Sequence, residues 1–260
     1  MEKQKILEII NNVRVEIDLV RIKNHPSKAW IEGESARREH CGSIEAPRDI
    51  APLIDHTLLK PDATIKQIFA LCDEADENGF ASVCINPYWV PVVAERLSKS
   101  SVLVCTVIGF PLGATLSLSK SYEANIAAAL GADELDMVIN IGQLKAHKWV
   151  AVFDDILSVV EAVESKPVKV ILETSLLTEE EIVAGSAISE LAGASYVKTS
   201  TGFAGGGATV ESVSLMASTV GNRLGVKASG GVGNFDSAIE MIRAGATRIG
   251  ASRSIQIISG

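Results

Sequence analysis

Three observations predict an α/β fold built from repeated strand–helix units. From residue 51 onward, short apolar segments alternate with longer amphipathic ones, which is the pattern of βαβ units. Eight predicted strands begin about 28 residues apart on average. Segments 102–107 and 168–172 are almost continuous apolar runs, as expected of parallel strands covered by helices on both faces. Eight such units fit a closed (β/α)8 TIM barrel. An open doubly wound sheet is the alternative, because periodicity cannot show closure.

Each element is predicted from its own stretch of sequence. Strands are predicted where apolar and β-branched residues gather between turn residues, and they span 52–56, 82–86, 102–109, 134–140, 168–174, 196–200, 226–229 and 248–251. Helices are predicted where apolar residues recur three or four positions apart, and they span 64–78, 89–98, 118–130, 144–164, 178–192, 209–220, 235–243 and 254–258.

The first fifty residues differ from this regular pattern. They open with an apolar stripe at helical spacing, formed by Ile6, Ile10, Val13, Ile17 and Val20. A polar stretch from about residue 23 to 48 follows. We therefore divide the chain into an N-terminal helical extension with linker, residues 1–50, and a catalytic barrel domain, residues 51–260. The stripe is expected to pack against the barrel or against a second subunit, as in a homodimer.

Composition excludes several classes of protein. Of the 260 residues, 47% are hydrophobic and 22% charged, which is ordinary globular composition. The net charge of −8 and the absence of a basic run argue against nucleic acid and anionic membranes as partners. No apolar run is long enough for a membrane span, and the N-terminus does not resemble a signal peptide. The four cysteines have no C-x-x-C spacing and are expected to be reduced, so a cytoplasmic protein is predicted.

Charged residues occur in predicted strands that should be apolar. Side chains alternate between the two faces of a strand, and in strands four to seven one face is largely apolar and is expected to meet the helices. The other faces then point into the barrel and carry Asp136, Lys169, Lys198 and Lys227. Buried lysines are rare. The plainer alternative is that one or two of them lie at strand ends and reach solvent.

This combination of residues suits Schiff-base chemistry on a carbonyl substrate. A lysine is a nucleophile only when its amine is neutral, a form that burial and neighbouring cations favour. A nearby aspartate can transfer protons or hold a water molecule.

Glycine-rich segments follow the last three predicted strands, at 201–207, 229–234 and 250–254. Backbone amides in such turns, together with a helix N-terminus, can bind an anion. The loops after strands seven and eight are the usual phosphate site of a barrel. A single Gly-Gly pair is more often only a tight turn, whereas three such loops together predict a phosphate site. Arg253 either adds charge there or is a solvated surface residue.

The remaining candidate residues give weaker signals. His25, His40, His56 and His147 are scattered without metal-ligand spacing, so neither a metal nor another cofactor is predicted. Asp55, at the end of the first strand, is either an inward hydrogen-bonding residue or a polar strand end facing water. Cys84 is either a buried thiol or part of a substrate pocket.

From about residue 50 to 258 the chain resembles the deoxyribose-phosphate aldolase family, whose members are class I aldolases on a (β/α)8 barrel. The segments that carry the resemblance agree in order, spacing and strand location, and they are IDHT (54–57), SVCINP (82–87), GFPLG (109–113), GADELD (131–136), VKVILET (168–174), VKTSTGF (197–203) and VKASGG (226–231). The resemblance implies reversible cleavage of 2-deoxy-D-ribose 5-phosphate to acetaldehyde and D-glyceraldehyde 3-phosphate.

The resemblance also implies a role for each site residue. Lys198 would form the Schiff base, Lys227 would be the cation that keeps Lys198 neutral, and Asp136 would work with Lys227 and a water molecule in proton transfer. The implied substrate-binding residues line the sugar pocket or the phosphate site, and they are Asp55, Cys84, Lys169, Thr201, Gly202, Gly230, Gly231 and Ser252.

Two departures from the family pattern concern the phosphate site. Gly233 stands where many relatives have arginine, and Arg253 stands where many have serine, so phosphate recognition is expected to be rearranged. The chain also ends at Gly260, without the tyrosine-bearing tail of some relatives. The alternatives are another Schiff-base barrel, such as a transaldolase or a different phospho-sugar aldolase, and a non-catalytic protein that binds phosphorylated sugars.

Overall fold

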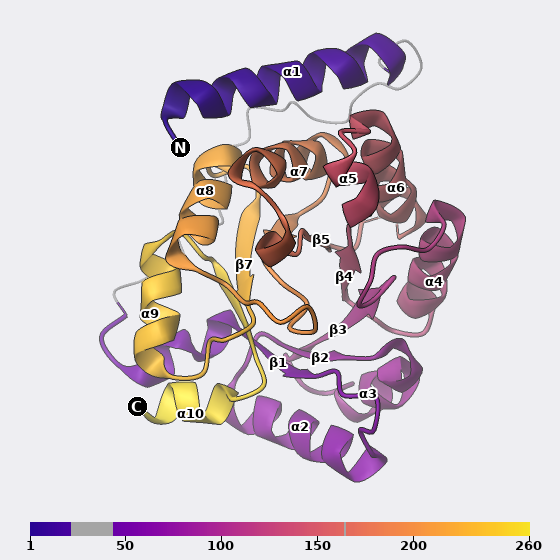
Figure 1. Cartoon of the computed structure of the whole chain (residues 1–260). Coiled ribbons are helices and arrows are strands. Elements are labelled where there is room, and N and C mark those ends of the chain that lie inside the picture. The colour runs from indigo at the N-terminus through magenta and orange to yellow at the C-terminus, as the bar shows by residue number, and fades with distance from the viewer. Residues whose placement is uncertain (22–43, 164) are drawn as a thin grey trace.

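The computed structural model describes residues 1–21, 44–163 and 165–260, and its eight parallel strands close into a barrel (Figure 1). The strands are β1 (Ile54–Leu58), β2 (Ser82–Ile85), β3 (Leu103–Ile108), β4 (Glu134–Val138), β5 (Val168–Ile171), β6 (Tyr196–Lys198), β7 (Gly225–Ser229) and β8 (Arg248–Ala251). Each strand pairs with the next, and β1 pairs with β8. This closure confirms the predicted TIM barrel and excludes the open sheet.

Helices cover the outside of the barrel (Figure 1). They are α2 (Ile65–Asn78), α3 (Val90–Arg96), α4 (Ser117–Ala129), α5 (Ile141–Lys145), α6 (Trp149–Ala162), α7 (Glu179–Leu191), α8 (Val210–Val220), α9 (Phe235–Arg243) and α10 (Ser254–Ser259), with short 3-10 helices η1 (Pro47–Leu53), η2 (Pro87–Trp89) and η3 (Thr174–Leu176). The largest apolar core lies between strands and helices, where Leu135, Met137 and Val170 are fully buried. The apolar strand faces therefore meet the helices, as alternation predicts.

Two differences from the predicted elements concern the start of the first strand and the continuity of one helix. The first strand begins at Ile54 instead of residue 52, because residues 47–53 form η1 and Pro52 has no N–H for a strand ladder. The single helix predicted over 144–164 is two helices, α5 and α6. Between them, His147 has a left-handed backbone with φ of 54°, which no continuous helix accommodates.

Helix α1 (Lys3–Arg21) confirms the predicted N-terminal helix and lies across the outside of α6, α7 and α8 (Figure 1). Four residues of the predicted stripe are buried, namely Ile6, Ile10, Val13 and Ile17, and Ile9 is buried with them. Val20 is 56% exposed, so the stripe ends one turn earlier than predicted. Of the two expected packing partners, the structure shows the barrel's own helices.

Much of the predicted linker, with His25, His40 and Cys41, lies outside the described residues. Among the helices that the structure does describe, none combines the length and apolarity needed to cross a bilayer.

Candidate active site

The four predicted inward residues meet inside the barrel. Asp136 on β4 is at the centre, and its Oδ2 accepts hydrogen bonds from the Nζ of Lys198 at 2.8 Å and the Nζ of Lys227 at 2.7 Å. Its Oδ1 accepts from the Nζ of Lys169 at 3.0 Å. All four side chains are buried. The alternative in which some of these lysines reach solvent therefore does not hold.

Strand register explains why these residues meet. Asp136 is paired with Lys169 across β4 and β5, and Lys198 is paired with Lys227 across β6 and β7. Residues in register on neighbouring parallel strands point the same way, so each pair enters the barrel at one level. Lys198 is the last residue of β6, which places it toward the carboxyl end of the barrel, where barrel active sites are built.

Two further carboxylates and one arginine extend the cluster toward the opposite end. Glu134 contacts the Nζ of Lys169 at 2.7 Å and both terminal nitrogens of Arg248 at 3.2 Å. Asp55 contacts Arg248 at 2.6 Å and also forms a short ion pair with Lys227. Glu134 and Arg248 are the first residues of β4 and β8. The network therefore extends from the amino-terminal end of the barrel strands to Lys198.

The charged network contains one basic group more than it contains carboxylates. The network holds three carboxylates and four basic groups, which are Asp55, Glu134 and Asp136 against Lys169, Lys198, Lys227 and Arg248. If one lysine is neutral, the buried charges balance. A fourth buried cation would be uncompensated, which is costly away from water.

Lys169 and Lys227 are held as cations. Burial alone would lower the pKa of each, but Asp136 and the neighbouring carboxylates outweigh burial and raise both pKa values above the usual range. Burial would likewise raise the pKa of Asp136, but Lys169, Lys198 and Lys227 hold it well below its usual value. Asp136 is therefore ionised and flanked by two fixed ammonium groups.

Lys198 is bound less firmly than the other two lysines. Lys169 contacts three carboxylates and Lys227 contacts two, and both are fully buried. Among the described residues, Lys198 contacts Asp136 alone, and it keeps 3% exposure. Of the three, Lys198 thus has the fewest carboxylate contacts and is the one whose amine a ligand can reach.

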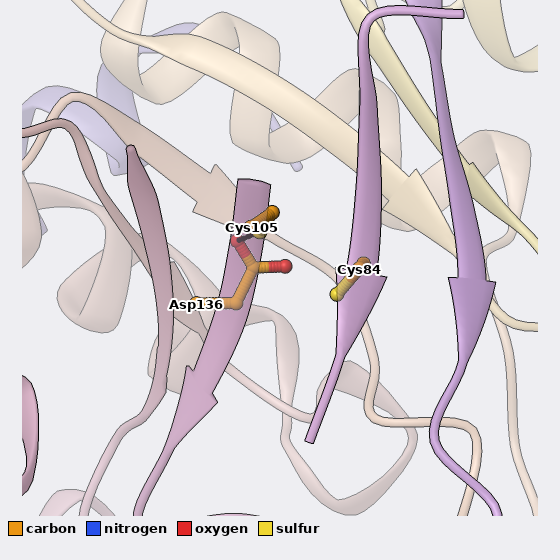
Figure 2. Close-up of side chains that lie close together, drawn as sticks. All are labelled: Cys84, Cys105 and Asp136. Carbon is orange, nitrogen blue, oxygen red and sulfur yellow. Dashed lines mark hydrogen bonds between the residues drawn. The ribbon is translucent and has the colours of Figure 1, made fainter. Parts of the chain in front are cut away.

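Two thiols adjoin Asp136. Cys84 and Cys105 are in register on β2 and β3, and both point toward the Asp136 carboxylate (Figure 2). The Sγ of Cys105 lies 3.2 Å from Asp136 Oδ1 and 3.4 Å from the Nζ of Lys169. The two sulfur atoms and an Asp136 oxygen lie within 4.8 Å of one another, close enough to share a metal ion. However, the ammonium groups of Lys169 and Lys227 already contact this carboxylate and would repel a metal ion, so the donor set fits a metal poorly.

Most of the predicted phosphate-binding residues lie on the rim rather than in this cluster. Gly202, Gly231 and Ser252 are exposed in the loops after β6, β7 and β8, and Gly230 is half-buried. Thr201 is buried instead, and its hydroxyl and backbone N–H both donate to Glu173 Oε2. The predicted phosphate-binding residues therefore lie apart from the lysine cluster, in the loops at the carboxyl end of the barrel.

The predicted strands 134–140 and 168–174 run too long. Alternation along them would place Asn140 on the same face as Asp136, and Glu173 on the same face as Lys169. Strand β5 ends at Ile171, and Glu173 has a left-handed backbone with φ of 60°. Strand β4 ends at Val138, and Asn140 caps α5 by accepting a hydrogen bond from the N–H of Gln143 at 3.1 Å. Both residues are thus capping or turn residues and not inward strand residues.

Sequence reasoning missed Glu134, Arg248 and Cys105. The signal for Glu134 was present, because it is two residues before Asp136 and so shares its face. Arg248 begins a strand, where a basic residue usually faces water, and no local pattern indicates that it pairs with β4 across the barrel.

Comparison with known proteins shows the family of the chain. Residues 50–257 match the profile of the DeoC/LacD family of aldolases. The chain belongs to this family. A deoxyribose-phosphate aldolase from Staphylococcus epidermidis is 60% identical over 210 residues, which are 81% of this chain and 96% of that protein.

Solved structures of family members extend the comparison beyond the barrel. A candidate deoxyribose-phosphate aldolase from Coccidioides immitis is 39% identical, with a TM-score of 0.83 over 100% of this chain and 97% of that one. A deoxyribose phosphate aldolase from Aeropyrum pernix, described as having a unique tetrameric structure, is 33% identical, with a TM-score of 0.78 over 86% of this chain and 95% of that one.

Proposed function

We propose that this protein is a class I aldolase that reversibly cleaves 2-deoxy-D-ribose 5-phosphate to acetaldehyde and D-glyceraldehyde 3-phosphate. The observation that carries the proposal is Lys198, a buried lysine with one carboxylate partner in a cluster that already contains enough cations to balance its acids. Family membership and the name of the relative from Staphylococcus epidermidis support the choice of substrate.

Lys198 is the proposed nucleophile. Its neutral amine attacks the C1 aldehyde of the open-chain sugar, and loss of water gives an iminium at C1. Removal of the proton from the C3 hydroxyl then breaks the C2–C3 bond. Glyceraldehyde 3-phosphate leaves, and the electron pair forms an enamine on the two carbons still attached to Lys198. Protonation of C2 and hydrolysis release acetaldehyde and restore the amine.

Asp136 and Lys227 are the proposed catalytic partners. Asp136 Oδ2 is 2.8 Å from the Lys198 nitrogen, which places an ionised carboxylate where protons must move during imine formation. Lys227 lies on the same oxygen at 2.7 Å, so the two lysine nitrogens are no more than 5.5 Å apart. At an effective dielectric of about 20 the repulsion between two ammonium groups at this separation is roughly 3 kcal/mol, so the charge of Lys227 acts directly on the Lys198 nitrogen.

The proposed substrate-binding residues form two groups. Asp55, Cys84 and Lys169 adjoin the catalytic cluster, where the sugar carbons would lie. The second group lies on or just below the rim, where the phosphate would lie, and consists of Thr201, Gly202, Gly230, Gly231 and Ser252.

The cellular setting is part of the proposal. We place the reaction in deoxyribonucleoside catabolism in the cytoplasm, without a metal or other cofactor, because an iminium supplies the electron sink that a Lewis acid would otherwise provide. We keep residues 1–50 as an extension outside the catalytic domain 51–260, because α1 contributes no residue to the lysine cluster.

Borohydride trapping tests the function and the nucleophile together. The protein is incubated with 2-deoxy-D-ribose 5-phosphate, reduced and digested, and the modified peptide is identified by mass spectrometry. We expect the adduct on Lys198 and free acetaldehyde in the unreduced reaction. An adduct on Lys169 or Lys227 would overturn the assignment. Trapping without acetaldehyde release would favour a transaldolase or another phospho-sugar aldolase, and no adduct would favour a binding protein.

We also propose that the chain forms a homodimer through α4. Leu118, Tyr122 and Ile126 are exposed at four-residue spacing along this helix, and Leu130 continues the row. Exposed apolar rows of this kind are typical of protein interfaces. The tetrameric relative from Aeropyrum pernix supports self-association. Light scattering should give twice the chain mass, and Tyr122→Lys should give the monomer mass.

A further inference from the structure

The turn after β8 carries an arginine that lies over the glycine loop after β7. Arg253 is exposed and directly precedes α10. Its Cδ and Nη1 atoms lie 3.6 and 3.8 Å from the position that a Cβ would occupy on Gly233. A long side chain at position 233 would therefore compete with Arg253 for the same space. Glycine at 233 leaves this space to the guanidinium.

The guanidinium of Arg253 has no anionic partner in the part of the chain that the structure describes. It forms neither an ion pair nor a side-chain hydrogen bond there, unlike Arg248 on the preceding strand, which is paired with Asp55 and Glu134. Arginine presents five N–H donors in a fixed plane that matches the oxygens of a phosphate. Arg253 is thus available to an anionic ligand.

Backbone amides beside Arg253 are available as well. Gly230 and Gly231 both have φ of 82°, a left-handed conformation that glycine adopts without strain. Within the described residues, the N–H groups of Gly230, Gly231 and Ser252 donate to no protein acceptor. Successive free amides in such a turn form a concave anion site, and the guanidinium adds a full positive charge to it.

This positive surface lies at the same end of the barrel as Lys198. Gly230 follows Lys227 by three residues along β7, a span of about 10 Å at 3.3 Å per residue. A Cβ on Gly250 of β8 would be 2.9 Å from the Cε of Lys227, so β8 approaches the Lys227 side chain closely. A five-carbon sugar with its aldehyde at Lys198 can therefore place a terminal phosphate near these two loops.

We propose that Arg253 is the residue that recognises the phosphate of the substrate by charge. This inference rests on the proposed function, because it assigns the anion partner of the same site. Arg253 reaches the loop after β7 from the turn after β8, across Gly233. The cation that faces the loop after β7 is therefore supplied by the turn after β8.

Two substrates separate phosphate recognition from catalysis. For Arg253→Gln we expect KM for 2-deoxy-D-ribose 5-phosphate to rise about tenfold or more, the scale of a charge-assisted hydrogen bond, with little change in kcat. Kinetics with unphosphorylated 2-deoxy-D-ribose should not change. Arg243→Gln is the matched control, because Arg243 is an exposed arginine at the opposite end of α9.

A second-site variant tests the position of the charge. Adding Gly233→Arg to Arg253→Gln returns a guanidinium to the same space from the other loop. We expect KM for the phosphorylated sugar to fall back toward the parent value. A merely structural role of Arg253 would not be rescued in this way.

The outcomes distinguish this inference from the proposed function. If the parent cleaves the phosphorylated sugar and Arg253→Gln leaves its KM unchanged, the role of Arg253 is wrong and the function stands. If the parent cleaves neither sugar, the function is wrong, and calorimetric titration with inorganic phosphate still tests Arg253. Weaker phosphate binding by Arg253→Gln would then support the anion site, and equal binding by both proteins would overturn it.

Discussion

Buried lysine side chains occur both inside the barrel and among the helices around it, and the two sites differ in how the charge is balanced. Lys120 on α4 contacts one carboxylate, Asp155 on α6, at 2.6 Å, and donates to the carbonyl oxygen of Val138 at 2.9 Å. It is a one-to-one ion pair outside the barrel. Inside the barrel, Lys198 shares the carboxylate of Asp136 with two other ammonium groups.

The difference shows that burial alone does not identify a reactive lysine. Burial lowers the pKa of Lys120, opposed by Asp155, and the side chain is fully buried between helices and strand. Lys198 has surplus cations around it and is the only lysine of its cluster with any exposure. Lys120 has a carboxylate of its own as counter-ion, whereas Lys198 shares its only carboxylate with two other lysines.

Replacing Lys198 and Lys120 in turn with methionine should show their different roles most clearly. Lys198→Met should lower kcat by at least about 10⁴-fold, because the nucleophile is lost. Its free energy of unfolding should change little, because the remaining charges of the network balance. Steady-state kinetics and urea unfolding measure the two quantities. Residual activity near the parent level would remove Lys198 from the mechanism.

Lys120→Met should show the opposite behaviour. Removing one partner of a buried ion pair leaves Asp155 uncompensated, so we expect a loss of about 3–5 kcal/mol of stability with kcat of the folded protein nearly unchanged. The double variant Lys120→Met with Asp155→Leu is the control, and it should recover part of the loss because no charge is left unpaired. A loss of kcat without a loss of stability would contradict the structural role.

Lys227→Leu tests the surplus of cations directly. Removing an ammonium group within 5.5 Å of the Lys198 nitrogen takes away roughly 3 kcal/mol of repulsion. Activity at neutral pH should fall, and the rise of activity with pH should move upward, so part of the rate returns in alkaline solution. An unshifted pH–rate profile would mean that Lys227 acts only in proton transfer.

A still smaller effect is expected for His56, a buried histidine of β1 whose side chain contacts α2 and α10. His56 contacts Ser254 and Glu74, both at 2.8 Å, and burial lowers its pKa although Glu74 opposes this. Between that lowered pKa and the unfolded value of about 6.5, the unfolded chain binds the extra proton. Stability should therefore fall as pH drops below about 6.5, by at most about 1.4 kcal/mol per pH unit. Urea unfolding from pH 5 to 8 should show a shallower slope in His56→Gln.

The strand–helix repeat and the residues of the inner barrel face could be predicted from the sequence alone. Alternation on β4 to β7 was enough to place Asp136, Lys169, Lys198 and Lys227 inside the barrel, because side-chain direction in a strand depends only on position parity. It failed at Glu173 and Asn140, where the strands had already ended. Strand ends are set by loop hydrogen bonds, such as the cap on α5, which periodicity does not report.

Which groups meet across the barrel could not be predicted in this way, because it depends on the closed fold. Ring closure brought Arg248 of β8 to Asp55 and Glu134, although 193 and 114 residues separate them along the chain. Closure also brought the side chain of Arg253 next to Gly233. Ion pairs and side-chain contacts of this kind depend on distances between strands that are far apart in the sequence, and local sequence patterns do not report those distances.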